Sequence, residues 1–352
     1  MLRSVCLVLF SSDMVHFRAI VAIGNTNSGH TTTVSGWNGN RVAAGTVSEA
    51  LHHWYDLSNC LVLLITVLTF AAVQIALWGN KCDLSISGGA SNSQTDVDVL
   101  GQVDVLQPYV LCDETSNVWN LLSQKRRCCI DIVLDNAGFE LFTDLCLAEF
   151  LISSGMASRV RFYGKLIPWF VSDVTATDWQ WSLDQLATSA TAKLQTLGQR
   201  WQQYLADGVW QFSTHPFWTL PYDFTAMKSA APDLYDELSA ADIVLFKGDL
   251  NYRKLVDDRV WPTTTPFTVA LRGFSPSSLC CLRTLKCDVV VGLSEGQAES
   301  ARVQHADWMI TGSYAVIQFS NVTLWRSFSP HVLTLLGDLP LHKSFCCCLS
   351  PV

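Results

Sequence analysis

The chain has 352 residues, of which 49% are hydrophobic and 15% charged, so it is long enough to bury one large α/β core, alone or beside a smaller segment. Its formal net charge of -8 argues against a nucleic-acid partner, because no basic stripe is available to neutralise a phosphate backbone. Its 13 cysteines include no Cys-x-x-Cys pair, which excludes the usual structural zinc motif, and we expect reduced thiols in a cytoplasmic protein.

The first eighty residues are poor in charged side chains and contain one uncharged apolar run, residues 60–78. The run is about long enough to span a bilayer. It is either a membrane anchor, a buried helix, or sequence foreign to the folded protein. Because no basic cluster flanks it and it lies too far along the chain for a signal peptide, we do not expect a membrane partner.

Regular structure is expected from about residue 77 onward. Apolar spacing and end signals predict helices at 113–122, at 139–155 with Gly155 as the stop, and at 179–207 with Gly208 as the stop. Short apolar runs predict strands at 129–135, 160–173 (one or two strands), 209–218, 241–249, 287–293 and 308–319. Strands that alternate with helices indicate an α/β fold, with a mostly parallel sheet covered on both faces.

Three of the expected strands end in an aspartate, at Asp135 (followed by Asn136), Asp173 and Asp249. Ligands of open parallel sheets bind beyond the carboxyl ends of the strands. Carboxylate and amide oxygens suit Mg²⁺ or Mn²⁺, which often bridge to phosphate. A single such aspartate is commonly only a helix N-cap. The three together, with the asparagine, favour a metal site.

Cationic residues follow the third aspartate. Arg253 and Lys254 come one turn after Asp249, and the segment 283–286 (Arg-Thr-Leu-Lys) precedes the strand expected at 287–293. Guanidinium and ammonium groups suit a phosphoryl group. The alternative is that these residues are ordinary solvated surface charges.

Six segments carry a resemblance to a known family: 77–85 (LWGNKCDLS), 133–145 (VLDNAGFELFTDL), 165–173 (KLIPWFVSD), 246–255 (FKGDLNYRKL), 282–293 (LRTLKCDVVVGL) and 314–319 (YAVIQF). In this order they resemble the damage-control phosphatases, in the sugar-phosphate subfamily with an Arg-Thr-x-Lys motif. That subfamily also includes proteins described as acidic-residue (protein-glutamate) carboxyl methyltransferases.

The resemblance implies a three-layer α/β/α core behind a helical subdomain, and a set of site residues. It places metal ligands at Asp135, Asn136 and Asp173, and implies Mn²⁺ as the metal, with Co²⁺ or Ni²⁺ as alternatives; the oxygen ligands would also accept Mg²⁺. We expect Asp135, Asp173 and Asp249 to be catalytic. The expected substrate contacts are Asp135, Asn136, Asp249, Leu250, Asn251, Tyr252, Arg253 and Lys286. Glu140 matches a position linked to a methyl donor.

The two ends depart from the family pattern. The family's helical subdomain is not recognisable in 1–76, and the chain continues through 321–352 where the family normally stops. We therefore expect an atypical segment at 1–76, with a truncated or replaced helical subdomain, then the metal-dependent phosphatase domain at 77–320 and an atypical tail at 321–352. Both ends are typical of mis-predicted gene boundaries.

The expected function is metal-dependent hydrolysis of small sugar phosphates, such as fructose 1-phosphate and fructose 6-phosphate, in metabolite damage control. One alternative is an S-adenosylmethionine-dependent protein-glutamate carboxyl methyltransferase, which needs no metal. Its usual glycine-rich loop is missing after the first expected strand, where the sequence reads DNAGFE. A second alternative is an inactive, truncated member of the family.

Overall fold

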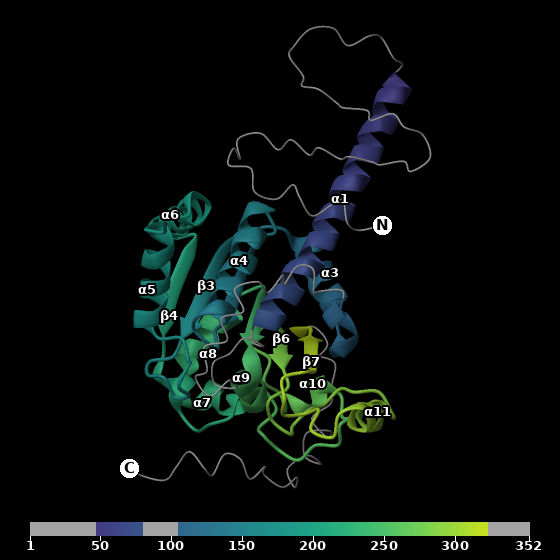
Figure 1. Ribbon diagram of the computed structural model, residues 1–352, viewed down its shortest axis with the longest axis vertical. Helices are drawn as coiled ribbons and strands as arrows, with labels where there is room; N and C mark the ends of the chain where they lie inside the picture. Colours follow the sequence, from purple (N-terminus) through teal and green to yellow (C-terminus); the bar gives the residue numbers. More distant parts are fainter. Residues whose placement is uncertain (1–46, 80–104, 323–352) are drawn as a thin grey trace. The chain divides into compact units, whose positions relative to one another are not determined.

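A computed structural model of the chain describes residues 47–79 and 105–322 (Figure 1). The chain divides into two compact units, Met1–Asn59 and Cys60–Val352. The described part of the first unit is the beginning of helix α1 (Val47–Trp78). Most of the segment expected to be atypical at the N-terminus, and nearly all of the expected C-terminal tail, lie outside the described residues.

The second unit is built on a seven-stranded sheet with the order β1-β7-β6-β5-β2-β3-β4. Five neighbouring strands, from β6 to β4, are mutually parallel; β7 pairs antiparallel with β6, and β1 pairs parallel with β7. The strands are β1 (Val110–Asp113), β2 (Cys128–Val133), β3 (Ala157–Gly164), β4 (Trp210–Thr214), β5 (Ile243–Lys247), β6 (Ser278–Thr284) and β7 (Ala315–Ser320).

Helices cover both faces of the sheet. The first face is covered by the C-terminal part of α1 and by α3 (Thr115–Lys125), α4 (Phe139–Ser153), α5 (Ala176–Ala187) and α6 (Ala192–Ala206). The second face is covered by α7 (Met227–Ala230), α8 (Pro232–Ser239), α9 (Gly248–Leu255), α10 (Phe267–Ala270) and α11 (Gln297–Gln304). Short 3-10 turns lie at Gln107–Tyr109, Pro216–Thr219 and Phe224–Ala226. The predicted three-layer α/β/α fold with a mostly parallel sheet is confirmed.

The alternation of side chains along a strand explains why two cores form. In β5, Ile243 and Leu245 belong to the first core, while Val244 and Phe246 belong to the second. Successive side chains of a strand point to opposite faces, so a strand buried on both faces needs an apolar residue at nearly every position. This is why β5 is apolar from Ile243 to Phe246, before its last residue, Lys247.

The apolar run at 60–78 forms the C-terminal part of α1. Its last turns are buried in the first core, where Val73, Ala76, Leu77 and Trp78 pack among residues of the sheet and its helices. Thr69 Oγ1 donates to the backbone oxygen of Ile65, so its hydroxyl is satisfied within the helix. Across the residues that the structure describes, no helix is long and apolar enough to cross a membrane.

Several predicted elements need correction. The single helix expected at 179–207 is two helices, α5 and α6, because the segment 188–191 (Thr-Ser-Ala-Thr) interrupts it. Its predicted stop at Gly208 is confirmed. The strand expected at 287–293 is wrong, because these residues have irregular backbone. The strand in this part of the chain is β6, which ends before them at Thr284. The run at 160–173 gives the single strand β3 followed by a loop.

Candidate functional site

The candidate site lies where β5, β2 and β3 end side by side. β2 lies between β5 and β3 and is parallel to both. The chain passes from β2 to β3 on one side and returns through β5 on the other, so the strand order reverses at this point. Open α/β sheets bind ligands at such switch points. Asp135 and Asn136 follow β2, and Asp249 lies in the first turn of α9, directly after β5.

Asp173 reaches the same edge by a different route from the predicted one. It does not end a strand, because β3 stops at Gly164 and a loop follows. Asn136 and Asp173 instead pair through an isolated antiparallel bridge. The Val174 N–H donates to Asp135 O over 2.9 Å, and the Ala137 N–H donates to Ser172 O over 2.7 Å. These backbone bonds bring Asp173 beside Asp135 and Asn136.

The Asn136 side chain is held in a fixed orientation. Its Nδ2 donates to Asp135 Oδ2 over 3.0 Å and to Glu140 Oε2 over 2.9 Å. Its Oδ1 accepts from the Ser172 hydroxyl over 2.7 Å. Both amide hydrogens are therefore used within the protein, and the amide oxygen, which is the end that can ligate a cation, points away from the two carboxylates.

Negative charge is concentrated and buried here. Asp135, Asn136 and Asp173 are 5%, 6% and 2% exposed. Burial first, and then the charges of Glu140 and Asp173, raise the pKa of Asp135 well above its ordinary value; Lys165 and Lys286 act in the opposite direction. Desolvated like charges are unfavourable unless a cation balances them.

The donor types at this edge suit a hard divalent cation. Two carboxylates and one amide oxygen are ligands that Mn²⁺ and Mg²⁺ accept. Among the described residues, no group of three or more His, Cys, Asp and Glu side chains is arranged to hold a metal ion. A metal here would therefore need the amide of Asn136, whose oxygen accepts from Ser172 in this structure. By the chemistry of their donor atoms, Asp135, Asn136 and Asp173 fit such an ion.

Gly248 lets the end of β5 approach Asp135 closely. It has a φ of +81°, a backbone conformation that favours glycine. A Cβ atom at this position would overlap the carboxylate oxygen Oδ2 of Asp135. The glycine thus serves both the turn into α9 and the space that the carboxylate occupies.

Asp249 is held by the Arg-Thr-Leu-Lys segment. Its Oδ1 accepts from Arg283 Nε over 2.7 Å and from the Lys286 backbone N–H over 3.1 Å. Arg283 is fully buried, lies over the Tyr252 ring with a 4.1 Å distance to its centroid, and also donates to the backbone oxygen of Cys287. The Arg283 side chain therefore orients Asp249, and the backbone N–H of Lys286 donates a second hydrogen bond to the same oxygen.

The other residues of the expected substrate loop have clear places in the fold. Leu250, Asn251 and Tyr252 are buried; Asn251 Nδ2 donates to Lys247 O over 2.7 Å, and Tyr252 Oη accepts from the Val291 N–H over 3.0 Å. Arg253 makes a paired contact with Asp258, from Nε over 2.9 Å and from Nη2 over 2.7 Å. Their contacts with a substrate stay a prediction, as does the methyl-donor contact of Glu140.

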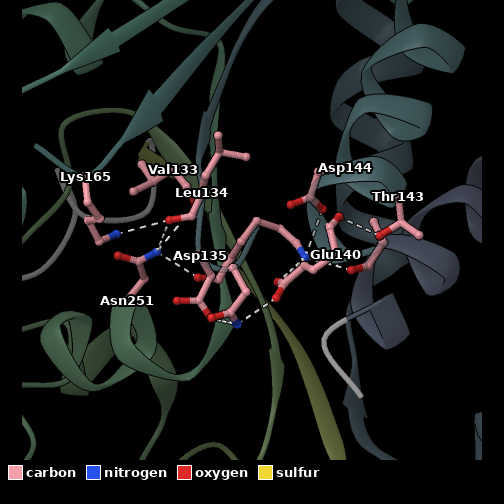
Figure 2. A network of polar contacts seen from close by, with 11 residues as sticks. Val133, Leu134, Asp135, Glu140, Thr143, Asp144, Lys165 and Asn251 are labelled. Carbon is pink, nitrogen blue, oxygen red and sulfur yellow. Dashed lines mark hydrogen bonds and ion pairs between the residues drawn. The ribbon is translucent and has the colours of Figure 1, made fainter. Parts of the chain in front are cut away.

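Two buried lysines belong to this region and were missed by the sequence analysis. Lys165 donates from Nζ to Leu134 O over 3.1 Å (Figure 2). Its charge also lowers the pKa of Asp135. Lys247 is the last residue of β5 and pairs with Glu140 and Asp144. Both lie inside segments that carry the family resemblance, at the end of a strand, and that position was the available signal.

Asp144 gives a pH-dependence prediction. Burial, followed by the charge of Glu140 and against the effect of Lys247, raises the pKa of Asp144 from 3.8 to about 7. Between these values the folded state keeps a proton that the unfolded state releases, so stability falls as pH rises through this window. An Asp144→Asn variant cannot ionise, and its melting temperature should change less between pH 5 and pH 8 than that of the wild type. Thermal melts at both pH values check this; an equally steep fall in the variant would contradict it.

Comparisons with known proteins point to one family. The family model described as the damage-control phosphatase ARMT1-like domain matches residues 43–301, a range that begins within the segment expected to be atypical. Proteins named damage-control phosphatase ARMT1 are similar to the chain: that of Danio rerio is 50% identical over 257 residues, that of Rattus norvegicus 49% over 256, and that of Homo sapiens 48% over 257.

These matches cover 71% of this chain, but only 57% of the Danio rerio protein and 58% of the other two, so the chain spans little more than half the length of these relatives. A crystal structure of a DUF89 family protein from Pyrococcus horikoshii aligns with a TM-score of 0.38 and 16% identity, over 63% of this chain and 60% of that one. Because the family model covers more than half of its residues, the chain belongs to the family with the damage-control phosphatase ARMT1-like domain.

Proposed function

We propose that this chain is a metal-dependent phosphatase of small sugar phosphates, with fructose 1-phosphate and fructose 6-phosphate among its substrates. The observation that carries the proposal is the buried set of Asp135, Asn136 and Asp173 at the switch point of the sheet. The names of its relatives, which are damage-control phosphatases, support the same reaction class.

In this proposal Asp135, Asn136 and Asp173 hold a divalent ion, with Mn²⁺ as the first candidate and Co²⁺, Ni²⁺ or Mg²⁺ as the others. A bound divalent ion supplies Lewis acidity toward the phosphoryl group and toward the attacking water. The bonds from Asn136 Nδ2 to Asp135 and Glu140, and from the Ser172 hydroxyl to its Oδ1, fix the orientation of the amide. Gly248 keeps space for the Asp135 carboxylate.

The cationic side chains near these three residues would balance the negative charge of the substrate's phosphoryl group. The charge of Lys286 lowers the pKa of Asp135, which supports a role for its ammonium near the proposed metal ligands. Asp258 orients the Arg253 guanidinium through two hydrogen bonds. In phosphoryl transfer, preorganised positive groups stabilise charge on the equatorial oxygens. Asp249, fixed by Arg283 and Lys286, either orients the attacking water or protonates the leaving alcohol.

A metal and substrate panel on the full chain tests the proposal. Phosphate release from fructose 1-phosphate and fructose 6-phosphate is measured after EDTA treatment and after adding back Mn²⁺, Co²⁺, Ni²⁺ or Mg²⁺. We expect release that is lost in EDTA and restored by a divalent metal. Methyl transfer from S-adenosylmethionine that persists in EDTA, with no phosphate release, would favour the carboxyl methyltransferase instead. An absence of both activities would also overturn the proposal.

A further inference from the structure

A buried ion cluster joins three segments next to the proposed metal ligands. Lys247 is fully buried, and its Nζ lies 3.1 Å from Glu140 Oε1, 3.0 Å from Asp144 Oδ1 and 2.7 Å from the backbone oxygen of Ala76. Figure 2 shows Glu140 and Asp144, both of α4, within this network of contacts. Burial lowers the pKa of Lys247, but the two carboxylates outweigh burial and raise it above its ordinary value, so the ammonium stays charged.

Glu140 connects this cluster to Asn136. One carboxylate oxygen, Oε1, accepts from Lys247, and the other, Oε2, accepts from Asn136 Nδ2 over 2.9 Å. Glu140 itself is 2% exposed. A carboxylate in this position accepts hydrogen bonds only, so it selects the amino end of the Asn136 amide and directs the oxygen end elsewhere. Asp144 shares the same lysine, with its Oδ1 on Lys247 Nζ.

The last turn of α1 completes the arrangement. The final carbonyls of a helix have no partner within it, and the Ala76 carbonyl finds one in Lys247. Gly79, just past the helix, lies so close to α4 that a Cβ atom there would overlap the Thr143 hydroxyl and lie 3.2 Å from the Glu140 Cα. The C-terminal turn of α1 is therefore packed against the turn of α4 that carries Glu140.

We propose that Glu140 and Lys247 are positioning residues, which fix the orientation of the Asn136 amide beside Asp135 and couple the last turn of α1 to the proposed metal ligands. This inference rests on the proposed metal-dependent function. It assigns a role to two residues that are not themselves proposed metal ligands. Partners that orient a metal ligand typically change metal affinity 10–100-fold when they are removed, in round numbers.

The test is the Mn²⁺ affinity of two matched variants, measured from the signal of free Mn²⁺ in electron paramagnetic resonance. In Glu140→Gln, the new amide cannot accept from both Lys247 and Asn136, so one donor faces another donor. We expect Mn²⁺ to bind about 10–100-fold more weakly. Asp144→Asn changes the other carboxylate on the same lysine without touching Asn136, and its Mn²⁺ affinity should stay within about 2-fold of the wild type.

Melting temperatures in EDTA separate positioning from stability. A purely structural role would lower the metal-free melting temperature of Glu140→Gln and leave its Mn²⁺ affinity unchanged, which would overturn the inference. Equal weakening in both variants would also overturn it, since the loss of either carboxyl group on Lys247 would then account for the effect. If Glu140→Gln does not fold, Glu140→Asp keeps the charge for Lys247 with a shorter reach to Asn136, and the same weakening is expected.

The outcome is distinguishable from failure of the proposed function. A wild-type chain that binds Mn²⁺ with the expected difference between variants, but releases no phosphate, would support the positioning roles and reject the phosphatase. A wild-type chain that binds no Mn²⁺ would overturn both. Normal phosphatase activity with an unchanged Mn²⁺ affinity in Glu140→Gln would reject only the positioning roles.

Discussion

An Asp173→Asn variant is expected to lose about 100-fold or more of the metal-dependent phosphatase activity and to keep its fold. The substitution preserves the size of the side chain, and an amide oxygen can still accept from the Phe170 N–H, which now donates to Asp173 Oδ2 over 2.8 Å. What is lost is one of the two negative charges assigned to the metal. Loss of an outer-shell partner already costs about 10–100-fold, so loss of a direct ligand should cost at least the upper end of that range.

The matched control is Asp236→Asn, the same chemical change at an exposed position of α8. Its activity should equal that of the wild type. Steady-state phosphate release with saturating Mn²⁺, together with a thermal melt of each variant, checks both statements. Full activity in Asp173→Asn would show that the ligand assignment is wrong.

A Gly248→Ala variant is expected to lose both stability and activity. The left-handed backbone at this position disfavours any side chain by about 1–2 kcal/mol, and a methyl group forced into a packed site costs about 1–3 kcal/mol more. The methyl group would overlap the Asp135 carboxylate, so either the start of α9 or the proposed metal ligand must move. Denaturant unfolding should therefore show a loss of roughly 2–5 kcal/mol, with phosphate release reduced at least about 10-fold.

Gly208→Ala isolates the backbone contribution. Gly208 has a φ of +68°, and a Cβ atom there would meet nothing within 4 Å. This variant should lose about 1–2 kcal/mol of stability and no activity. If the two alanine variants lost the same amount of stability and activity, the close approach of Gly248 to Asp135 would not matter for function.

The sequence was sufficient to predict that the candidate site lies at the carboxyl edge of the sheet. Strands buried on both faces are recognisable because they are mostly apolar. Mostly apolar runs, interrupted by Asp131 in β2 and by Lys247 at the end of β5, led to Asp135 and Asp249, and parallel strands bring such ends together. Asp173 was placed at this edge for a wrong structural reason. Asp173 lies in the loop after β3, not at the end of a strand. Its position depends on its bridge to Asn136, and no pattern in the neighbouring sequence predicts that bridge.

The error at residues 287–293 has a tertiary origin. Three valines predicted a strand, and Val289, Val290 and Val291 are indeed buried in the second core. Side chains take the place of a neighbouring strand: Arg283 donates to the Val289 carbonyl, and the Val291 N–H donates to Tyr252. Propensity indicated burial correctly but could not specify which groups satisfy the backbone.

Buried lysines were beyond the reach of sequence patterns for a related reason. Lysine is almost always exposed unless it is paired. The partners of Lys247 come from Ala76, Glu140 and Asp144, and the partner of Lys165 is the Leu134 carbonyl. Because these contacts join distant parts of the chain, the charge balance at the site becomes visible only in the folded structure.

The central claim is that Asp135, Asn136 and Asp173 hold the divalent ion that hydrolysis requires. The most direct test is a Mn²⁺ titration of the wild type and of Asp173→Asn, followed by electron paramagnetic resonance of free Mn²⁺. A ligand set of this kind predicts a single saturable site per wild-type chain and at least about 10-fold weaker binding in Asp173→Asn. Equal Mn²⁺ binding by the two proteins, or no saturable binding by the wild type, would contradict it.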